Sequence, residues 1–411
     1  MDAATAAVLA PLQAVLPPAL EVYRDLHRHP ELSGDEARTA SRFGDELADA
    51  GLDVARAVGG HGVVGVLGNG AGPTVLLRTE LDALPVDERT GLAYASRTPG
   101  VMHACGHDAH AAALTAAAVL LARGSRHWRG TLVIVGQPAE ETLAGASAML
   151  ADGLYTRFPR PDVVLAQHVA PFPAGGVVHS PGLVLPAGAA LELVLHARGG
   201  HPGISRPADN PIAAAAALVQ RLHALSIPGE LLVTVGALHA GVRANIVPET
   251  ARMSISLRSY SPDRLTRAMA DIEALARDAV GPGGAAQAEA VSRAPCTIND
   301  PRYGRAVRTG HRALLGAHAA CVAPSSMATE DFALLGPAGT GLYDGTPIPA
   351  VYWSVGSVAA EHWRSAPGAT PAEKSAAIPA NHSSSFAPHP GATLRTATAA
   401  MTAAALSCLT S

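Results

Sequence analysis

Three histidines, one cysteine and one aspartate lie within ten residues of the chain, in the segment VMHACGHDAH at residues 101–110. Imidazole, thiolate and carboxylate are ligands that zinc, cobalt, nickel and manganese accept, whereas magnesium and calcium prefer oxygen alone. Cys105 and His107 are two residues apart, so an extended backbone would turn both side chains to the same side. For His103 and His110, packing or a helix start is the simpler interpretation. The segment therefore predicts a metal site that includes Cys105 and His107.

Acidic and imidazole side chains also follow three apolar runs that are typical of buried strands. TVLLRT (74–79) precedes Glu80 and Asp82, TLVIVG (131–136) precedes Glu140 and Glu141, and DVVLAQ (162–167) precedes His168. One such case is most simply a helix cap or a turn. Three in succession favour a ligand site, because the carboxyl ends of parallel strands share one crevice. Glu140 and Glu141 are adjacent and must diverge, so one can bind metal while its neighbour acts as a general base.

The elements that position these residues follow an α/β rhythm. Helical spacing over about 12–32 and 34–51 is followed by short apolar runs that alternate with helices, which predicts a mixed, mainly parallel sheet flanked by helices. From about Gly188 the pattern becomes strand, helix, strand, strand, helix, strand, as in a ferredoxin-like α+β module. We therefore expect a catalytic domain in two parts, 1–186 and 298–411, interrupted by an inserted domain over 187–297.

Length and composition exclude several classes of protein. The chain has 411 residues, which is more than one core usually holds, and its net charge is −4 without a basic run. This argues against nucleic-acid binding and against a polybasic membrane patch. At the N-terminus, Asp2 replaces the basic region of a signal peptide, and Pro11, Pro17 and Pro18 are expected to interrupt any long helix. The four cysteines have no paired spacing, so we expect no disulfide framework and a reducing cytoplasm.

Several motifs in order give the chain a resemblance to a known family. The run LLRTELDALPVDERTGLAYASRTPGVMHACGHDAH, with QPAEE, QHV, ARGGHPG, NIVPE, TEDFA and NHSSSF, resembles the aminoacylase and carboxypeptidase-type metallo-amidohydrolases. The branch it is most similar to contains hippurate hydrolases, N-acyl-amino-acid hydrolases and auxin-conjugate hydrolases. The likeness extends from about Val22 to Pro390.

This resemblance implies a function and a set of site residues. It implies an enzyme that cleaves the amide bond of an N-acyl amino acid with two divalent ions, which are Zn, Mn, Co or Ni. The implied ligands are Cys105, which bridges the ions, with His107, Glu141, His168 and His382. Glu140 resembles the general base, and Asp82 resembles the carboxylate that orients the site. Without the resemblance, the segment ANHSSSF around His382 is most simply a helix cap or a loop.

The inserted domain resembles a dimerisation and lid domain. His201 is similar to a histidine that reaches into the active site of the partner subunit and stabilises the oxyanion, and Asn245 and Arg258 are similar to substrate-binding lid residues. Arg258 has the alternative of an exposed salt bridge on a strand. Three residues depart from the pattern of this branch: Glu80 replaces an aspartate, Pro202 replaces a small residue, and NHSSSF lacks a proline after its histidine.

Four alternative interpretations remain open. The enzyme can be a dipeptidase or carboxypeptidase of the same family, or the chain can be a non-catalytic dimer with a residual metal site. A thiol hydrolase that uses Cys105 as its nucleophile is a third possibility. Phosphate binding at GNGAGP is the fourth, but that segment lacks the lysine and the following helix of a P-loop.

Overall fold

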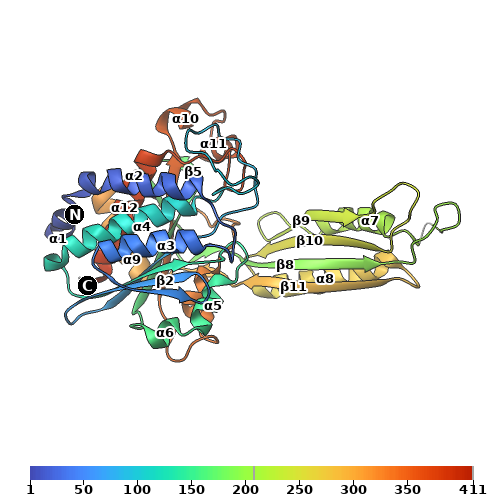
Figure 1. Ribbon diagram of the computed structural model, residues 1–411, viewed down its shortest axis with the longest axis horizontal. Helices are drawn as coiled ribbons and strands as arrows, with labels where there is room; N and C mark the ends of the chain where they lie inside the picture. The colour runs from blue at the N-terminus through green and yellow to red at the C-terminus, as the bar shows by residue number, and fades with distance from the viewer. Residues whose placement is uncertain (207–208, 410–411) are drawn as a thin grey trace. The chain divides into compact units, whose positions relative to one another are not determined.

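The computed structural model describes residues 1–206 and 209–409 (Figure 1). They divide into two compact units. The larger unit comprises Met1–Val184, Ile298–Pro324 and the chain from Asp331, and the smaller unit comprises Leu185–Thr297 and Ser325–Glu330. The short strands β7 (Leu183–Leu185) and β12 (Thr297–Ile298), which pair with each other, lie at the two crossings. Sequence patterns gave no sign that residues 325–330 return to the smaller unit.

An eight-stranded mixed sheet forms the centre of the larger unit, in the order β1-β2-β4-β3-β5-β14-β6-β13. The strands are β1 (Asp53–Val58), β2 (Gly62–Asn69), β3 (Thr74–Glu80), β4 (Gly130–Gln137), β5 (Val163–Pro173), β6 (Val177–His179), β13 (Ala320–Val322) and β14 (Ala350–Val358). The central strands β4, β3, β5 and β14 are parallel, whereas β1, β2 and β6 introduce antiparallel pairs. β3 and β4 are buried along nearly their whole length, as expected for strands covered on both faces.

Helices cover this sheet. They are α1 (Ala3–Leu9), α2 (Leu12–Arg28), α3 (Ala37–Asp49), α4 (His107–Arg123), α5 (Gly145–Ala151), α6 (Leu154–Arg157), α9 (Pro301–Leu315), α10 (Ala360–Ser365), α11 (Pro371–Ala376) and α12 (Pro390–Leu409), with 3-10 turns η1 (Ser125–His127), η3 (Asp331–Leu335) and η4 (Pro337–Gly339). α4 packs against α2 and α12 (Figure 1). α4 and α12 are alanine-rich and buried nearly all round, which is typical of core helices.

The N-terminal prolines do not break the helix in which two of them lie. α2 continues through Pro17 and Pro18, so the expectation that they interrupt a long helix was wrong. Both prolines are exposed, as are Gln13 and Ala14, whose carbonyls lose their helical partners and can be hydrated instead. In the part of the chain that the structure describes, no single helix is long and apolar enough to cross a membrane. α1 and α2, which are bent by 51°, pass that test only as a pair, by length and composition.

The smaller unit has one four-stranded antiparallel sheet, in the order β11-β8-β10-β9. Its elements are β8 (Ala187–His196), α7 (Pro211–His223), β9 (Leu231–Ala240), β10 (Thr250–Ser259), α8 (Pro262–Val280) and β11 (Ala285–Ala294). Alternate residues of β8 and β10 are buried against the helices, where Leu218, Leu222 and Ile272 are fully covered. The predicted fold class, a mixed α/β sheet domain with a ferredoxin-like module, is confirmed.

Candidate metal centre

Carboxylates reach the candidate site from the ends of β3 and β4. Asp82 lies two residues beyond β3, and its fully buried Oδ2 accepts hydrogen bonds from Ser33 Oγ at 2.7 Å and from the Glu141 N–H at 2.9 Å. Glu140 and Glu141 lie in the loop after β4, in which Ala139 (φ 50°) has left-handed backbone geometry. That geometry costs a residue with a Cβ about 1–2 kcal/mol, so neighbouring contacts must hold it. One of them is the bond from the Ala139 N–H to the carboxylate of Glu36, at 2.8 Å.

Gly106 makes the turn between Cys105 and His107. Its φ of 89° is left-handed, and a Cβ at this position would lie 2.5 Å from Val169 Cγ2. Only glycine fits, and α4 begins at the next residue. The predicted extended backbone from Cys105 to His107 was therefore wrong. The turn nevertheless brings together Cys105, His107 and His168, whose ligand atoms all lie within 4.8 Å of one another.

His168 lies inside β5 rather than after its end. β5 extends to Pro173, and His168 pairs with Ser354 of β14. β3 pairs with β5 only as far as Ala166, so His168 lies beyond the part of β5 that β3 covers. The Nδ1 of His168 donates to the Val169 carbonyl at 2.7 Å, which leaves Nε2 to face Cys105 Sγ at 3.3 Å.

His382 comes from a distant loop that is tied to the cysteine segment. Its backbone is left-handed, with a φ of 70°, and its N–H donates to the Ala104 carbonyl at 2.8 Å. The neighbouring Asn381 donates from Nδ2 to the carbonyls of Cys105 at 3.0 Å and Val169 at 3.2 Å. These bonds place His382 Nε2 3.5 Å from Glu141 Oε2, while the imidazole stays half exposed.

Two groups of potential ligands overlap at one atom. Cys105, His107 and His168 form the first group, and Cys105, Glu141 and His382 form the second, each with ligand atoms within 4.8 Å of one another. Both contain the thiol of Cys105, which is the arrangement that a shared ligand between two adjacent ions requires. Glu140 belongs to a third such group, with His107 and Glu141.

The two nitrogens of His107 have different surroundings. Nδ1 lies 2.9 Å from the main-chain oxygen of Asp82 and 3.2 Å from its Oδ1, so this nitrogen donates. Nε2 is buried, has no hydrogen-bond partner among the described residues, and lies 3.8 Å from carboxylate oxygens of both Glu140 and Glu141. Burial alone lowers the pKa of His107, but Asp82, Glu80 and Glu141 outweigh it and raise the pKa to about 10. This buried nitrogen among acids is suited to a cation.

The thiol of Cys105 has surroundings that disfavour a bare thiolate. Burial, and then the nearby carboxylates of Glu141 and Glu140, raise its pKa well above the ordinary value for cysteine. A divalent cation would reverse this balance, because a coordinating thiol is deprotonated. The donor set of thiol, imidazoles and carboxylate thus fits a borderline metal ion better than a cysteine nucleophile that acts alone.

His110 supports the site through hydrogen bonds at both nitrogens. Nδ1 donates to Glu80 Oε2 at 2.8 Å, and Nε2 accepts the Val169 N–H at 2.8 Å. Glu80 also pairs with Nη1 of Arg78, and Nη2 of the same arginine donates to Asp331 Oδ1 at 3.0 Å. The glutamate that replaces an aspartate at position 80 therefore links a buried arginine to His110. This occupation of both nitrogens agrees with a packing role for His110.

His103 is buried as well, but neither of its ring nitrogens has a hydrogen-bond partner in the described part of the chain. Burial lowers the pKa of His103 to about 4, so the imidazole is neutral at pH 7. This agrees with the interpretation of His103 as a packing residue.

The other three residues that the resemblance implied lie in the smaller unit. His201 and Asn245 are exposed, whereas Arg258 is half-buried on β10 and donates to the Met327 carbonyl at 3.0 Å. Their roles stay predictions.

Sequence reasoning missed several residues that hold the cluster in place. Asn381, Ser33, Gln137 and Asp331 make buried or half-buried hydrogen bonds to it or to its supports. Asn381, Gln137 and Asp331 lie in the quoted motifs NHSSSF, QPAEE and TEDFA, but no role was predicted for them, and Ser33 lies outside every quoted motif. The pairing of Asn381 with the Cys105 carbonyl joins residues 276 positions apart, so no local pattern could reveal it.

Comparison with known proteins relates the whole arrangement to one family. The chain is 36% identical over 258 residues to hippurate hydrolase of Campylobacter jejuni (61% of this chain, 66% of the relative). It is 31% identical over 325 residues to N-acetylcysteine deacetylase of Bacillus subtilis (77% and 84%). The crystal structure of a Bacillus subtilis protein described as a dinuclear metal binding peptidase from the M20 family superposes with a TM-score of 0.69 at 25% identity, covering 96% of this chain and 99% of that one. The model of peptidase family M20/M25/M40 matches residues 76–362, so the chain belongs to this family of hydrolases.

Proposed function

We propose that the protein hydrolyses the amide bond of N-acyl amino acids, with release of a carboxylate and a free amino acid. The observation that carries this proposal is the pair of ligand groups that share Cys105, with the acid Glu140 beside them. The names of two relatives support the substrate class, since hippurate and N-acetylcysteine are both N-acyl amino acids. We further propose that the protein acts in a reducing cytoplasm, which suits the four free cysteines of the described residues.

Five side chains would hold two divalent ions: Cys105, His107, Glu141, His168 and His382. The thiolate of Cys105 would be shared, His107 and His168 would complete one position, and Glu141 and His382 the other. Their mixture of sulfur, nitrogen and oxygen suits zinc, manganese, cobalt or nickel. Bound there, the ions would act as Lewis acids toward an amide carbonyl and would make a water molecule more acidic.

Glu140 is proposed as the general base. The residue is 5% exposed, and its carboxylate lies 3.8 Å from His107 Nε2, in one group with the proposed ligands His107 and Glu141. There it would accept the proton of the attacking water and return it to the leaving nitrogen. Asp82 would hold His107 with Nδ1 as donor, so that Nε2 stays directed at the metal position.

The smaller unit would supply groups for the substrate. His201 is proposed to donate to the oxyanion from a partner subunit, and Arg258 to pair with the carboxylate of the amino acid, with Asn245 beside the amide. This assignment rests on the resemblance of their motifs. A histidine from a partner subunit requires a dimer. The two edge strands of the small sheet indicate where such a dimer would form.

The outer strand β9 has the properties of a dimer edge. Its outward row includes exposed Leu232 and Leu238, and the row carries no acid, lysine or arginine. The opposite edge, β11, exposes Glu289 and Arg293, and charged side chains protect an edge strand against pairing. We therefore propose that β9 pairs with β9 of a second copy of the chain.

The edge proposal predicts a different oligomeric state for two matched variants. Leu238→Lys places a charge in the β9 row and should convert the dimer to monomer in light scattering. Val291→Lys changes an apolar residue on β11 that is also exposed, 54% against 42% for Leu238, and should leave the dimer intact. Equal masses for both variants and the wild type would refute β9 pairing.

Substitution of Glu140 tests the proposed reaction. Glu140→Gln keeps the shape of the side chain but cannot accept the proton, so kcat should fall by about 10²–10⁴-fold. Metal analysis should still find two ions per chain, and light scattering should find the dimer. Activity close to that of the wild type would show that Glu140 is not the base.

Peptide hydrolysis is the second candidate function, because a solved structure with the same fold is described as a peptidase. A panel of N-acetyl, N-benzoyl and long-chain N-acyl amino acids and dipeptides separates the two candidates by kcat/KM. A preference for dipeptides would replace the N-acyl proposal. A metal-loaded protein with no activity on the whole panel would favour a non-catalytic dimer.

A further inference from the structure

A small cavity lies in the larger unit, and none of the residues that line it belongs to the candidate metal centre. It has a volume of about 210 Å³ and is bordered by the end of β6 and the first turns of α9. The polar side chains that line it include His179, Asn299, Asp300, Arg305 and Arg308. None of these residues has a role in the proposed hydrolysis.

His179 presents a hydrogen-bond acceptor to this cavity. The neighbouring His311 must carry its proton on Nε2, which lies 2.9 Å from the carbonyl of Ala400, so its Nδ1 is an acceptor. His179 Nε2 lies 3.0 Å from that Nδ1 and must therefore donate to it. Burial, with His311 and Arg308 nearby, lowers the pKa of His179 to about 3, so the ring is neutral and its Nδ1 bears a lone pair. His179 is 97% buried, and Nδ1 has no partner among the described residues.

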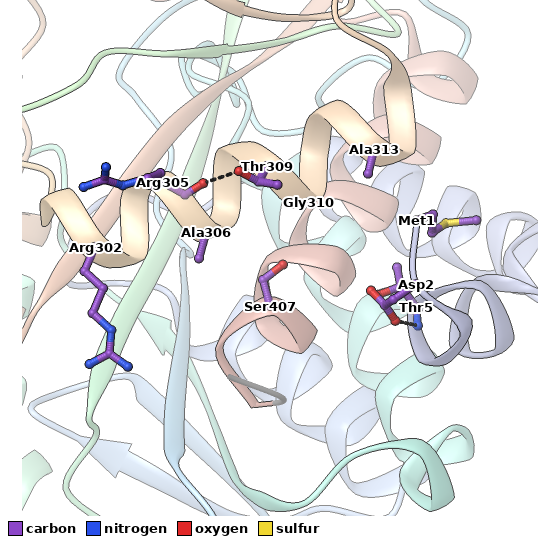
Figure 2. Close-up of a pocket in the computed structure, with 10 residues that line it drawn as sticks. All are labelled: Met1, Asp2, Thr5, Arg302, Arg305, Ala306, Thr309, Gly310, Ala313 and Ser407. Atoms are coloured by element: carbon purple, nitrogen blue, oxygen red, sulfur yellow. Dashed lines mark hydrogen bonds between the residues drawn. The ribbon is translucent and has the colours of Figure 1, made fainter.

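Two arginines supply positive charge to the same cavity. The guanidinium groups of Arg305 and Arg308 form no ion pair or hydrogen bond with any residue that the structure describes. Arg308 is half-buried, and Arg305 is exposed. Arg305 also lines a second groove, formed by residues of α1, α9 and α12, and Figure 2 shows its guanidinium pointing away from Ser407 and Met1 of that groove. An unpaired and half-buried guanidinium favours an anionic partner.

Asp300 contributes a carboxylate to the lining of the same cavity. Its Oδ1 caps α9 by accepting the N–H groups of Arg302 and Tyr303, both at 2.8 Å. Asn299 is fully used, because it bonds the main chain of Ser180 and Tyr352. The cavity therefore offers acceptors from Asp300 and His179, and cationic donors from Arg305 and Arg308.

We propose that this cavity binds a small α-amino acid. The carboxylate would pair with Arg308 and Arg305, and the ammonium group would donate to His179 Nδ1 and to the carboxylate of Asp300. An α-amino acid carries both groups on one carbon, and the limited volume of the cavity restricts the ligand to a small side chain. The proposal does not depend on the proposed hydrolysis, because binding is measured without turnover.

Calorimetric titration of the metal-loaded protein with glycine, L-alanine and L-serine tests the proposal. Arg308→Gln should weaken binding of the best ligand about tenfold or more, since a charge-assisted hydrogen bond is lost. Arg312→Gln is the matched control, because it removes an exposed cation from the same helix outside the cavity. It should bind as the wild type does.

Two further comparisons make the result specific. Acetate lacks the ammonium group and methylamine lacks the carboxylate, so each should bind the wild type about tenfold or more weakly than the best amino acid. His179→Phe removes the acceptor and should lose binding, and Arg305→Gln serves in its place if the His179 variant does not fold. The proposal is overturned if none of the three amino acids binds at millimolar concentration. It is equally overturned if Arg308→Gln and Arg312→Gln bind alike, which would locate the ligand elsewhere, for example at the metal centre.

Discussion

Two histidines of the larger unit are buried to the same extent, and yet one is protonated at pH 7 and the other is neutral. His27 and His311 are both 0% exposed. His27 lies 2.6 Å from Asp108 and 3.2 Å from Glu88, and these carboxylates outweigh burial and raise its pKa to about 9. His311 has only a carbonyl and another imidazole as partners, and burial lowers its pKa to about 4. Partner chemistry, rather than burial, therefore decides whether a buried histidine carries a proton.

The candidate metal centre resembles the surroundings of His27, because carboxylates lie around its histidine as well. Asp82, Glu80 and Glu141 raise the pKa of His107, as Asp108 and Glu88 raise that of His27, and Glu140 adds a further carboxylate near the ring. The His27 cluster balances its acids with a protonated imidazole. At the metal centre the number of acids is larger, and buried carboxylates are costly unless cations or hydrogen bonds compensate them.

The strongest expected effect follows from removal of the proposed cations. A chelator should reduce amide hydrolysis by at least about a thousandfold and lower the melting temperature, and added Zn²⁺ or Mn²⁺ should restore both. Cys105→Ser should lose metal in elemental analysis, whereas His311→Gln, in the neutral pair, should keep it. If the metal-free protein remained active and lost activity on alkylation of Cys105, the thiol-hydrolase interpretation would replace the metal centre.

An intermediate effect is expected at His27. Replacement by glutamine leaves the acids of Asp108 and Glu88 without a cation, which should cost about 3 kcal/mol of unfolding free energy at pH 7. Because the pKa of His27 is raised when folded, its contribution is complete below about pH 6.5 and is lost as the pH rises through about 9. Denaturation of the metal-loaded wild type should show this alkaline loss, and His27→Gln should show less of it.

His29→Gln is the control for that experiment, since His29 lies at the end of the same helix with a side chain that is 34% exposed. It should change stability by less than about 0.5 kcal/mol. Equal alkaline slopes for the wild type and His27→Gln would mean that His27 is neutral in the folded protein.

Local patterns predicted those parts of the site that lie at the ends of strands. Runs of buried residues followed by acids located Asp82, Glu140 and Glu141, because parallel strands end at a common edge. Cys105 and His107 do lie close together, as predicted, but the predicted cause, an extended backbone, was wrong. The backbone between them is not extended. Gly106 has a left-handed backbone, which brings the two side chains together, and a Cβ at this position would collide with Val169.

The remaining parts depend on contacts between distant segments. His382 reaches the cluster through a left-handed backbone that the Ala104 carbonyl holds, and Arg78 pairs with Asp331 across 253 residues. Such contacts carry no periodic signal, so His382 could be named only by resemblance to a family. The same holds for the His179 and His311 pair, which β6 and α9 bring together from 132 residues apart.

The smallest expected effect concerns His311 and has the opposite sign to that of His27. Its pKa is lowered when folded, so the unfolded chain binds more protons and stability falls as the pH drops from about 6.5 toward 4. Glutamine can keep both hydrogen bonds, by donating to the Ala400 carbonyl and accepting from His179, but it does not titrate. His311→Gln should therefore stay within about 1 kcal/mol of the wild type at pH 7 and be roughly 2 kcal/mol more stable relative to it near pH 5. Parallel pH profiles in chemical denaturation would show that His311 is not a buried neutral histidine, and the contrast with His27 would then rest on something other than their partners.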